Sequence, residues 1–250
     1  MLQAAFVLCL VILPWSAVPE IRVQECESAG DQPAAEDVPW QAMVQFKKIG
    51  ICNGAILNTN YILTAPDCVR DKVPSDLGVR VGYRRRYDGD FAGVCQVIIH
   101  PQSSKTNQSS NLALLKLCEP LDPSETIKEI GIIDKQPKNG AEAFISGYGS
   151  YNNSVYYCDP LTLRKKAVQL YDLKACAAER RLSAPTISVT DLNFCAEKKE
   201  RLCSFHKGAP LVVDGKLAGI LSFGDCSTEP DVFVNVLYHK KWLQANTKEI

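Results

Sequence analysis

Short runs of apolar residues recur along most of the chain, and turn-forming residues separate them. Gly, Pro, Asn and Asp interrupt these runs at close intervals. Many short strands joined by turns are typical of an all-β barrel or sandwich. The pattern therefore predicts an all-β domain with strands near 42–46, 61–65, 78–82, 94–100, 112–117, 142–146, 166–170, 211–213, 217–223 and 232–236.

Two segments have the spacing of amphipathic helices instead. One covers 173–181, and the other closes the chain at 237–246. In the second segment, Leu237, Trp242 and Leu243 fall on one side at the helical period. We expect this apolar stripe to be buried and His239 to lie on the helix surface.

The first apolar segment, 4–13, is too short to span a bilayer. Small residues follow it at Ser16 and Ala17, as in a secretory signal peptide cut near 17–19. A membrane anchor is the alternative, and the short apolar length disfavours it. We expect a secreted, extracellular protein with a signal peptide at 1–18, a short N-terminal segment at 19–30 and one domain at 31–250.

Composition and charge narrow the partners. With 46% hydrophobic and 22% charged residues, the chain of 250 residues can build an ordinary globular core. Its formal net charge is zero, which argues against nucleic acid or an anionic membrane as the main partner. The charge clusters at 84–86 and 198–201 are short, so we expect them in solvated loops.

Cysteines are numerous, and their count indicates disulfides. Eleven are present, and loss of Cys9 with the signal peptide leaves an even ten. In a secreted chain this predicts up to five disulfides. No CxxC motif or Cys/His cluster has zinc-finger spacing, so we expect no metal and no other cofactor.

Residues 203–211, Cys-Ser-Phe-His-Lys-Gly-Ala-Pro-Leu, resemble the nucleophile loop Cys-x-Gly-Asp-Ser-Gly-Gly-Pro-Leu of trypsin-like serine proteases. Residues 52–68 resemble the family's Cys-Gly-Gly-x-Leu-Ile and Trp-Val-Leu-Thr-Ala-Ala-His-Cys segments, and 111–117 resemble Asp-Ile-Ala-Leu-Leu-Lys-Leu. The resemblance implies two six-stranded antiparallel β-barrels with a cleft between them and a C-terminal helix. Further matches in the same order occur at 39–41, 146–149, 221–224 and 230–236.

The resemblance also implies that the catalytic machinery is replaced. Asp67, Asn111 and Lys207 stand at the positions of the catalytic histidine, aspartate and serine. Phe205 stands at the oxyanion-hole glycine, whose backbone freedom a residue with a Cβ lacks. His206 stands at the aspartate that pairs with the activated N-terminus. We therefore expect a protein that is not an enzyme.

Two alternatives bear on this expectation. A lysine can act as a base when burial lowers its pKa, but an adjacent carboxylate favours the charged ammonium. We therefore expect Lys207 and Asp67 to form an ion pair rather than a new catalytic pair. The activated terminus would fall at 27–30, where no Ile-Val pair and no preceding basic residue occur. We expect no proteolytic maturation beyond removal of the signal peptide.

The former specificity pocket is implied to be lined by Arg201, Ser222, Gly224 and Asp231, with Arg201 at its base. We hypothesise that Arg201 and Asp231 pair and fill the pocket, since arginine and carboxylate suit a bidentate contact. The alternative is that Arg201 binds an acidic group of a ligand.

Disulfide pairings follow from the same resemblance. It implies Cys52–Cys68, Cys176–Cys195 and Cys203–Cys226, while Cys95 and Cys118 lie on strands that the fold would pair. Cys26 and Cys158 then remain for a fifth bridge. Sequons at Asn107 and Asn152 allow N-glycosylation in a secreted chain, although a sequon can go unused.

Together these features predict an inactive serine protease homologue of the insect type that acts by binding. We expect a cofactor, decoy or carrier whose partners are other secreted proteins, such as active proteases, inhibitors or carrier proteins. Immune-cascade homologues often carry a cysteine-rich domain before the protease-like one. The short segment at 19–30 therefore favours a stand-alone factor, for example in reproduction, over a haemolymph cofactor. A serine-type peptidase with altered chemistry is the competing hypothesis.

Overall fold

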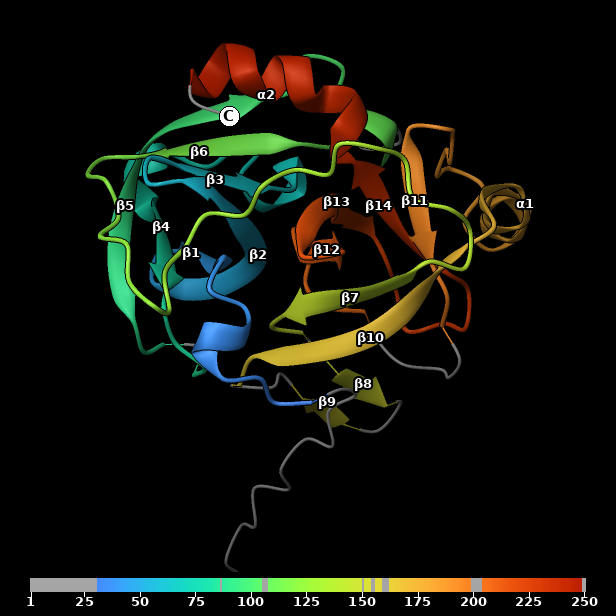
Figure 1. Cartoon of the computed structure of the whole chain (residues 1–250), viewed down its shortest axis with the longest axis horizontal. Helices are drawn as coiled ribbons and strands as arrows, with labels where there is room; N and C mark the ends of the chain where they lie inside the picture. The colour runs from blue at the N-terminus through green and yellow to red at the C-terminus, as the bar shows by residue number, and fades with distance from the viewer. Residues whose placement is uncertain are drawn as a thin grey trace, which may run out of the picture.

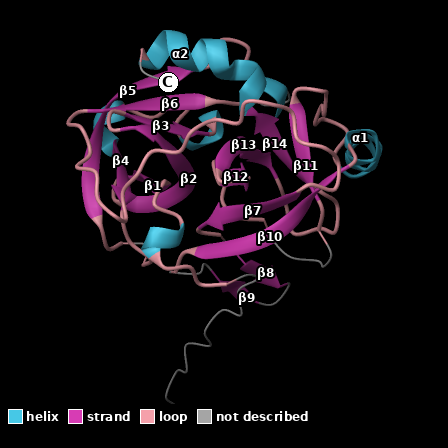
Figure 2. Ribbon diagram, in the orientation of Figure 1, coloured by secondary structure: helices cyan, strands magenta, loops and turns pink. Residues whose placement is uncertain are grey.

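The computed structural model describes residues 31–85, 87–104, 108–149, 151–153, 156–158, 162–198 and 204–248. Two closed six-stranded antiparallel barrels lie side by side, as Figure 1 and Figure 2 show. The predicted all-β, double-barrel fold is therefore confirmed. The first barrel has the order β1-β2-β3-β6-β5-β4, and the second has β10-β11-β14-β13-β12-β7.

The strand bounds follow the apolar runs closely. The first barrel contains β1 Gln41–Phe46, β2 Ile49–Asn58, β3 Tyr61–Thr64, β4 Leu77–Val81, β5 Asp90–Ile99 and β6 Ala113–Leu117. The second contains β7 Glu142–Gly147, β10 Arg164–Tyr171, β11 Asn193–Ala196, β12 Pro210–Val213, β13 Lys216–Phe223 and β14 Asp231–Asn235. A separate hairpin pairs β8 Tyr151–Asn153 with β9 Tyr156–Cys158. Every expected strand overlaps a strand of the structure.

The expected list lacks two barrel strands, and the reason is local. Strand β11 has only four residues, and it begins with the polar Asn193. Strand β2 is buried over most of its length, so it has no alternation of apolar and polar residues. Strands buried on both sides are hard to recognise from a period of two.

Tight hairpins set the register of two strand pairs. Lys47 and Lys48 join β1 to β2, and both have a positive φ, at 49° and 67°. Asp214 and Gly215 join β12 to β13 in the same way, with φ of 48° and 73°. Positive φ at both central residues is the requirement of a type I′ turn, whose twist matches that of paired strands.

The helices lie on the outside of the two barrels (Figure 1). Helix α1 spans Leu173–Ser183 and begins at the N-cap Asp172, whose side chain accepts from the Ala175 N–H at 2.9 Å. Short 3-10 helices occur at η1 Ala35–Asp37, η2 Pro66–Cys68, η3 Pro74–Asp76, η4 Gln108–Ser110 and η5 Val236–His239, and α2 spans Lys240–Thr247. None of the described helices has both the length and the apolar character needed to cross a membrane.

The C-terminal helix corrects one expectation. Leu243 is fully buried, and Leu237 and Trp242 pack against the core, as the apolar stripe predicts. His239, however, is buried and not on the surface, with 6% of its area exposed. It ends η5 before α2 begins, so its ring turns inward and Nε2 lies 2.8 Å from the Ser109 carbonyl oxygen.

Three of the predicted disulfides are present, and each of the other two includes a cysteine that lies outside the described residues. Cys52–Cys68, Cys95–Cys118 and Cys176–Cys195 are all formed. Cys226 is also disulfide-bonded, but its predicted partner Cys203 lies outside the described residues. Cys26 and the sequon residue Asn107 also lie outside the described residues. For Cys158 and the sequon residue Asn152, only the backbone is described.

Candidate functional site

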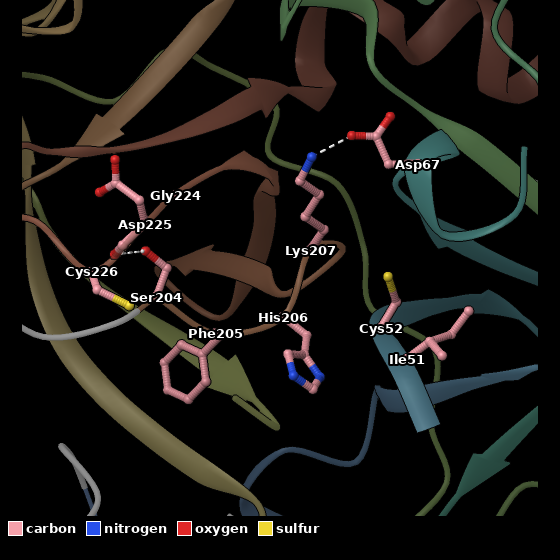
Figure 3. Close-up of a pocket in the computed structure, with 10 residues that line it drawn as sticks. All are labelled: Ile51, Cys52, Asp67, Ser204, Phe205, His206, Lys207, Gly224, Asp225 and Cys226. Atoms are coloured by element: carbon pink, nitrogen blue, oxygen red, sulfur yellow. Dashed lines mark hydrogen bonds and ion pairs between the residues drawn. The ribbon is translucent and has the colours of Figure 1, made fainter. Parts of the chain in front are cut away.

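A cleft of about 400 Å³ lies where the two barrels meet (Figure 3). The first barrel contributes β2 and η2, and the second contributes the loop before β12 and the segment after β13. These elements bring together residues that are far apart in the sequence. The lining residues are Ile51, Cys52, Asp67, Ser204, Phe205, His206, Lys207, Gly224, Asp225 and Cys226.

An ion pair crosses the cleft between the barrels. Lys207 Nζ donates to Asp67 Oδ2, as Figure 3 shows. The side chains of Lys207 and Asp67 are 35% and 25% exposed. Asp67 lies in η2, which the Cys52–Cys68 disulfide ties to β2. The predicted pairing is confirmed, and both side chains are committed to each other rather than to an incoming ligand.

Asn111 does not join this pair through any hydrogen bond of the described residues. It is fully buried, and its Oδ1 accepts from Ser103 Oγ at 3.1 Å. Ser103 in turn accepts from Arg70 at 2.9 Å. The Nδ2 of Asn111 is buried without a hydrogen-bond partner. A neutral amide in this place cannot orient a cationic base as a carboxylate does.

The loop that carries Lys207 is held by backbone bonds to the second barrel. His206 N donates to the Tyr148 carbonyl at 3.0 Å, and Phe205 forms an antiparallel bridge with Gly149. Phe205 is not among the described residues with a positive φ, whereas Gly208 has a φ of +84°. The loop therefore has a left-handed residue after Lys207 but not at the oxyanion-hole position.

Asn53 is a positioning residue that sequence analysis overlooked. Its Nδ2 donates to the carbonyls of Tyr148 and His206 at 2.8 and 2.9 Å, and its Oδ1 accepts from Tyr148 N at 2.8 Å. Its backbone N–H also donates to the Lys207 carbonyl at 2.8 Å. A signal was available, because Asn53 stands where the family segment Cys-Gly-Gly has a glycine. The side chain links the first barrel to the loop of the second.

A buried lysine occupies the region of the former specificity pocket. Lys198 is 4% exposed, and its Nζ lies 2.9 Å from Asp231 Oδ1. The same nitrogen donates to Ser204 Oγ at 2.9 Å and to the Asp225 carbonyl at 2.7 Å. All three ammonium donors are therefore satisfied inside the protein. The expectation of a solvated loop at 198–201 is wrong for Lys198.

This arrangement changes the hypothesis about Arg201. Arg201 lies outside the described residues, so its pairing with Asp231 stays a prediction. Asp231 already has a cationic partner in Lys198 and accepts from Ser204 Oγ at 2.5 Å. Burial raises the pKa of Asp231, and the ammonium of Lys198 and the Ser204 hydroxyl oppose that rise.

The backbone just after β13 passes close to Asp231. A Cβ added at Gly224 would lie 2.6 Å from Asp231 Oδ1 and closer still to Ser204 Oγ. Ser222, two residues before Gly224 in β13, is fully buried and donates to Gln108. Gly224 therefore leaves no room for a side chain of its own beside Ser204 and Asp231.

A second buried cation supports the same region. Arg180, from α1, is fully buried and donates to the Pro230 and Glu229 carbonyls at 2.9 and 3.0 Å. It also forms an ion pair with Asp225 Oδ2 at 2.9 Å. Burial raises the pKa of Asp225, but the Ser227 hydroxyl and the Arg180 guanidinium outweigh this, so the pKa is lowered.

Comparison with known proteins places the chain in a family. Residues 28–243 match the family described as Trypsin. Hypodermin-A of Hypoderma lineatum is 29% identical over the full length of both chains. Trypsin delta of Drosophila melanogaster is 30% identical over 87% of each chain. The chain therefore belongs to the trypsin family.

Solved structures agree with this placement. The crystal structure of the scabies mite inactivated protease paralogue S-D1 superposes with a TM-score of 0.79 at 25% identity. It covers 88% of this chain and 97% of that one. Neuropsin, a serine protease expressed in the limbic system of mouse brain, superposes with a TM-score of 0.75 at 25% identity, over 87% of this chain and 98% of that one.

Proposed function

We propose that this trypsin-family chain is a secreted, non-catalytic protein that acts by binding other secreted proteins, as a cofactor, decoy or carrier. The observation that carries the proposal is the ion pair of Lys207 with Asp67 at the nucleophile and base positions. An ammonium group held by a carboxylate has no lone pair to offer as a nucleophile or base.

The other parts of the site support the same function. Acyl transfer needs a base oriented by a third group and donors for the oxyanion. Asn111 bonds to Ser103, and Phe205 occupies the oxyanion-hole position with a side chain and a negative φ. Loss of one oxyanion donor alone costs about 10²–10³ in rate.

The internal bonds at the former specificity pocket support a binding role without substrate recognition. A peptidase of this family places a substrate side chain in the pocket, where Lys198, Ser204 and Asp231 here bond to one another. Among the structures similar to this chain, the scabies mite protein is described as an inactivated protease paralogue. The relatives described as trypsins and kallikreins are the basis of the competing hypothesis, an altered peptidase.

A serine-reactive fluorophosphonate probe tests the proposal. We expect the purified chain to gain no mass after incubation, while an active trypsin in the same buffer is labelled to completion. Labelling of the chain in proportion to its amount would overturn the proposal. If the chain is not labelled, co-purification from the native secretion is the experiment that identifies its binding partner.

A further inference from the structure

We propose that one surface of the chain binds an acidic segment of a partner protein. This inference rests on the proposed binding function and names the chemistry of the partner. The surface, here called the basic–aromatic face, consists of Tyr83, Arg84, Arg85, Phe91, Arg164 and Lys165. It is formed by the β4–β5 connection, the first residues of β5 and the start of β10, which begins on the side of the first barrel (Figure 1).

Backbone pairing brings two basic runs together that are far apart in the sequence. Leu163 N donates to the Arg84 carbonyl at 2.7 Å, and Arg85 forms an antiparallel bridge with Thr162. Tyr148 Oη donates to the Tyr83 carbonyl at 3.0 Å from a buried position. The connection is therefore fixed on the second barrel, with its arginines beside Arg164 and Lys165.

The cations of this face are not neutralised by carboxylates of the described residues. Arg84 and Arg85 are exposed and form no ion pair there. Arg164 donates to the amide oxygen of Gln32 at 3.2 Å, and Lys165 Nζ lies 4.1 Å from the centre of the Phe144 ring. The formal net charge of the whole chain is zero, so attraction of an acidic segment depends on local groups such as these four cations.

Negative groups nearby do not cancel this charge. Asp88 and Asp90 are exposed in the same hairpin, and Asp31 pairs through its backbone with Lys165 at 2.9 Å. None of these three carboxylates forms an ion pair with a residue of the face in the described part of the chain. An incoming acidic segment can therefore reach both arginines.

Exposed aromatic rings adjoin the cations. Tyr83 and Phe91 are 53% and 56% exposed. The guanidinium of Arg80 lies 5.7 Å from the centre of the Phe91 ring and donates to the Gly89 carbonyl at 2.8 Å. A Cβ at Gly89 would be 2.9 Å from Tyr83 Cδ2, so the Tyr83 ring lies against the hairpin whose Gly89 carbonyl accepts from Arg80.

This composition favours a protein partner over a sulfated polysaccharide. Tyrosine and arginine are enriched in the residues that dominate protein–protein binding energy. Arginine also binds carboxylates in a bidentate geometry. A polysaccharide would use the cations and leave the exposed Tyr83 and Phe91 rings without a role, so it is an outcome of the test below.

A fluorescent peptide composed of Glu, Asp and Tyr is the probe, with the Gln, Asn and Tyr version as its neutral control. We expect the acidic peptide to bind the full chain and to weaken as salt rises, because exposed charges are screened. Arg84→Glu/Arg85→Glu should weaken binding by about tenfold or more. Lys128→Glu/Lys241→Glu, with the same charge change on other exposed positions, should bind like the parent chain.

Phe91→Ser separates a protein site from a purely electrostatic one. We expect it to weaken the acidic peptide by several-fold and to leave a heparin fragment unaffected. Equal binding of the two peptides, equal effects of the two charge-reversal variants, or tighter binding of the heparin fragment would each overturn the proposal. Fluorophosphonate labelling of the same preparation reports separately on the proposed non-catalytic function.

Discussion

Lys198 Nζ lies 2.9 Å from Asp231 Oδ1, and both side chains are almost completely buried. Removing one partner of a buried ion pair leaves an uncompensated charge, which costs about 3–5 kcal/mol. We expect Lys198→Ala to lower the free energy of unfolding by about that amount, measured by denaturant titration.

Two control variants distinguish the buried charge from a general loss of contacts. Lys240→Ala removes an exposed partner of Asp134 and should cost at most about 1 kcal/mol. Lys198→Met/Asp231→Leu replaces both charges by apolar groups and should recover most of the loss. A Lys198→Ala protein as stable as the parent would contradict the buried pairing.

Asn53 is predicted to be the main polar link between the first barrel and the loop at 204–208. Its side chain makes bonds to Gln41, Tyr148 and His206, so Asn53→Ala leaves several buried groups unsatisfied. Each unsatisfied buried group costs about 1–3 kcal/mol. We expect a loss of about 3 kcal/mol in the free energy of unfolding.

Asn60→Ala is the matched control for this change. Asn60 is half-buried, and within the described part of the chain its side chain donates only to the neighbouring Thr59, at 3.3 Å. We expect it to cost less than about 1 kcal/mol. Similar losses for the two variants would argue against a special role of Asn53.

Substitution of Gly208 is predicted to destabilise the fold strongly. Its φ is +84°, and a Cβ there would lie 2.6 Å from Thr64 Oγ1 and closer still to the Asn53 carbonyl. Gly215 has a similar φ of +73° but open space around it. We expect Gly215→Ala to cost about 1–2 kcal/mol and Gly208→Ala clearly more, with thermal unfolding as the measurement. Equal losses would show that the close approach to Asn53 is absent.

The buried histidines His100 and His239 predict loss of stability in acid. Burial lowers the pKa of His100 from 6.5 to about 4, with a further contribution from His239, and burial also lowers the pKa of His239. Their rings meet edge to face at 4.8 Å, and the Trp242 ring lies equally close to His100. Gln102 N donates to His100 Nδ1 at 3.3 Å, which requires that nitrogen to be unprotonated.

The direction in which the unfolding free energy changes with pH follows from these lowered pKa values. The unfolded chain binds protons at higher pH than the folded chain, so His100 contributes full stability above pH 6.5. That contribution, about 3 kcal/mol by the size of the shift, is lost as the pH falls from 6.5 toward 4. His100→Phe should flatten the dependence of the unfolding free energy on pH over this range. An unchanged slope would contradict the buried neutral ring.

Sequence motifs were enough to predict the barrels, the Lys207–Asp67 pair and three disulfides. The resemblance to trypsin-like proteases carries this information, since Cys52, Asp67 and Cys68 belong to one segment whose frame is preserved. The burial of Lys198 and His239 was not predicted, because it depends on contacts with Asp231 and Ser109 from distant segments. Nothing in the composition of 198–201 distinguishes a solvated lysine from an internal one.

The meeting of Arg84 and Arg85 with the start of β10 was equally hidden. The run at 84–86 is short and suggests a solvated loop by itself, whereas the start of β10 adjoins a predicted strand at 166–170. Only the backbone bonds of Arg84 and Arg85 to Leu163 and Thr162 place them side by side.

The most direct test of the central claim is hydrolysis of a peptide library by the chain purified beside its Lys207→Ala variant. The account predicts that neither protein cleaves any peptide above the buffer control, because Lys207 and Asp67 bind each other and supply no nucleophile. The variant serves to identify any contaminating protease, whose activity would be the same in both preparations. Turnover by the parent chain that disappears in Lys207→Ala would contradict the account.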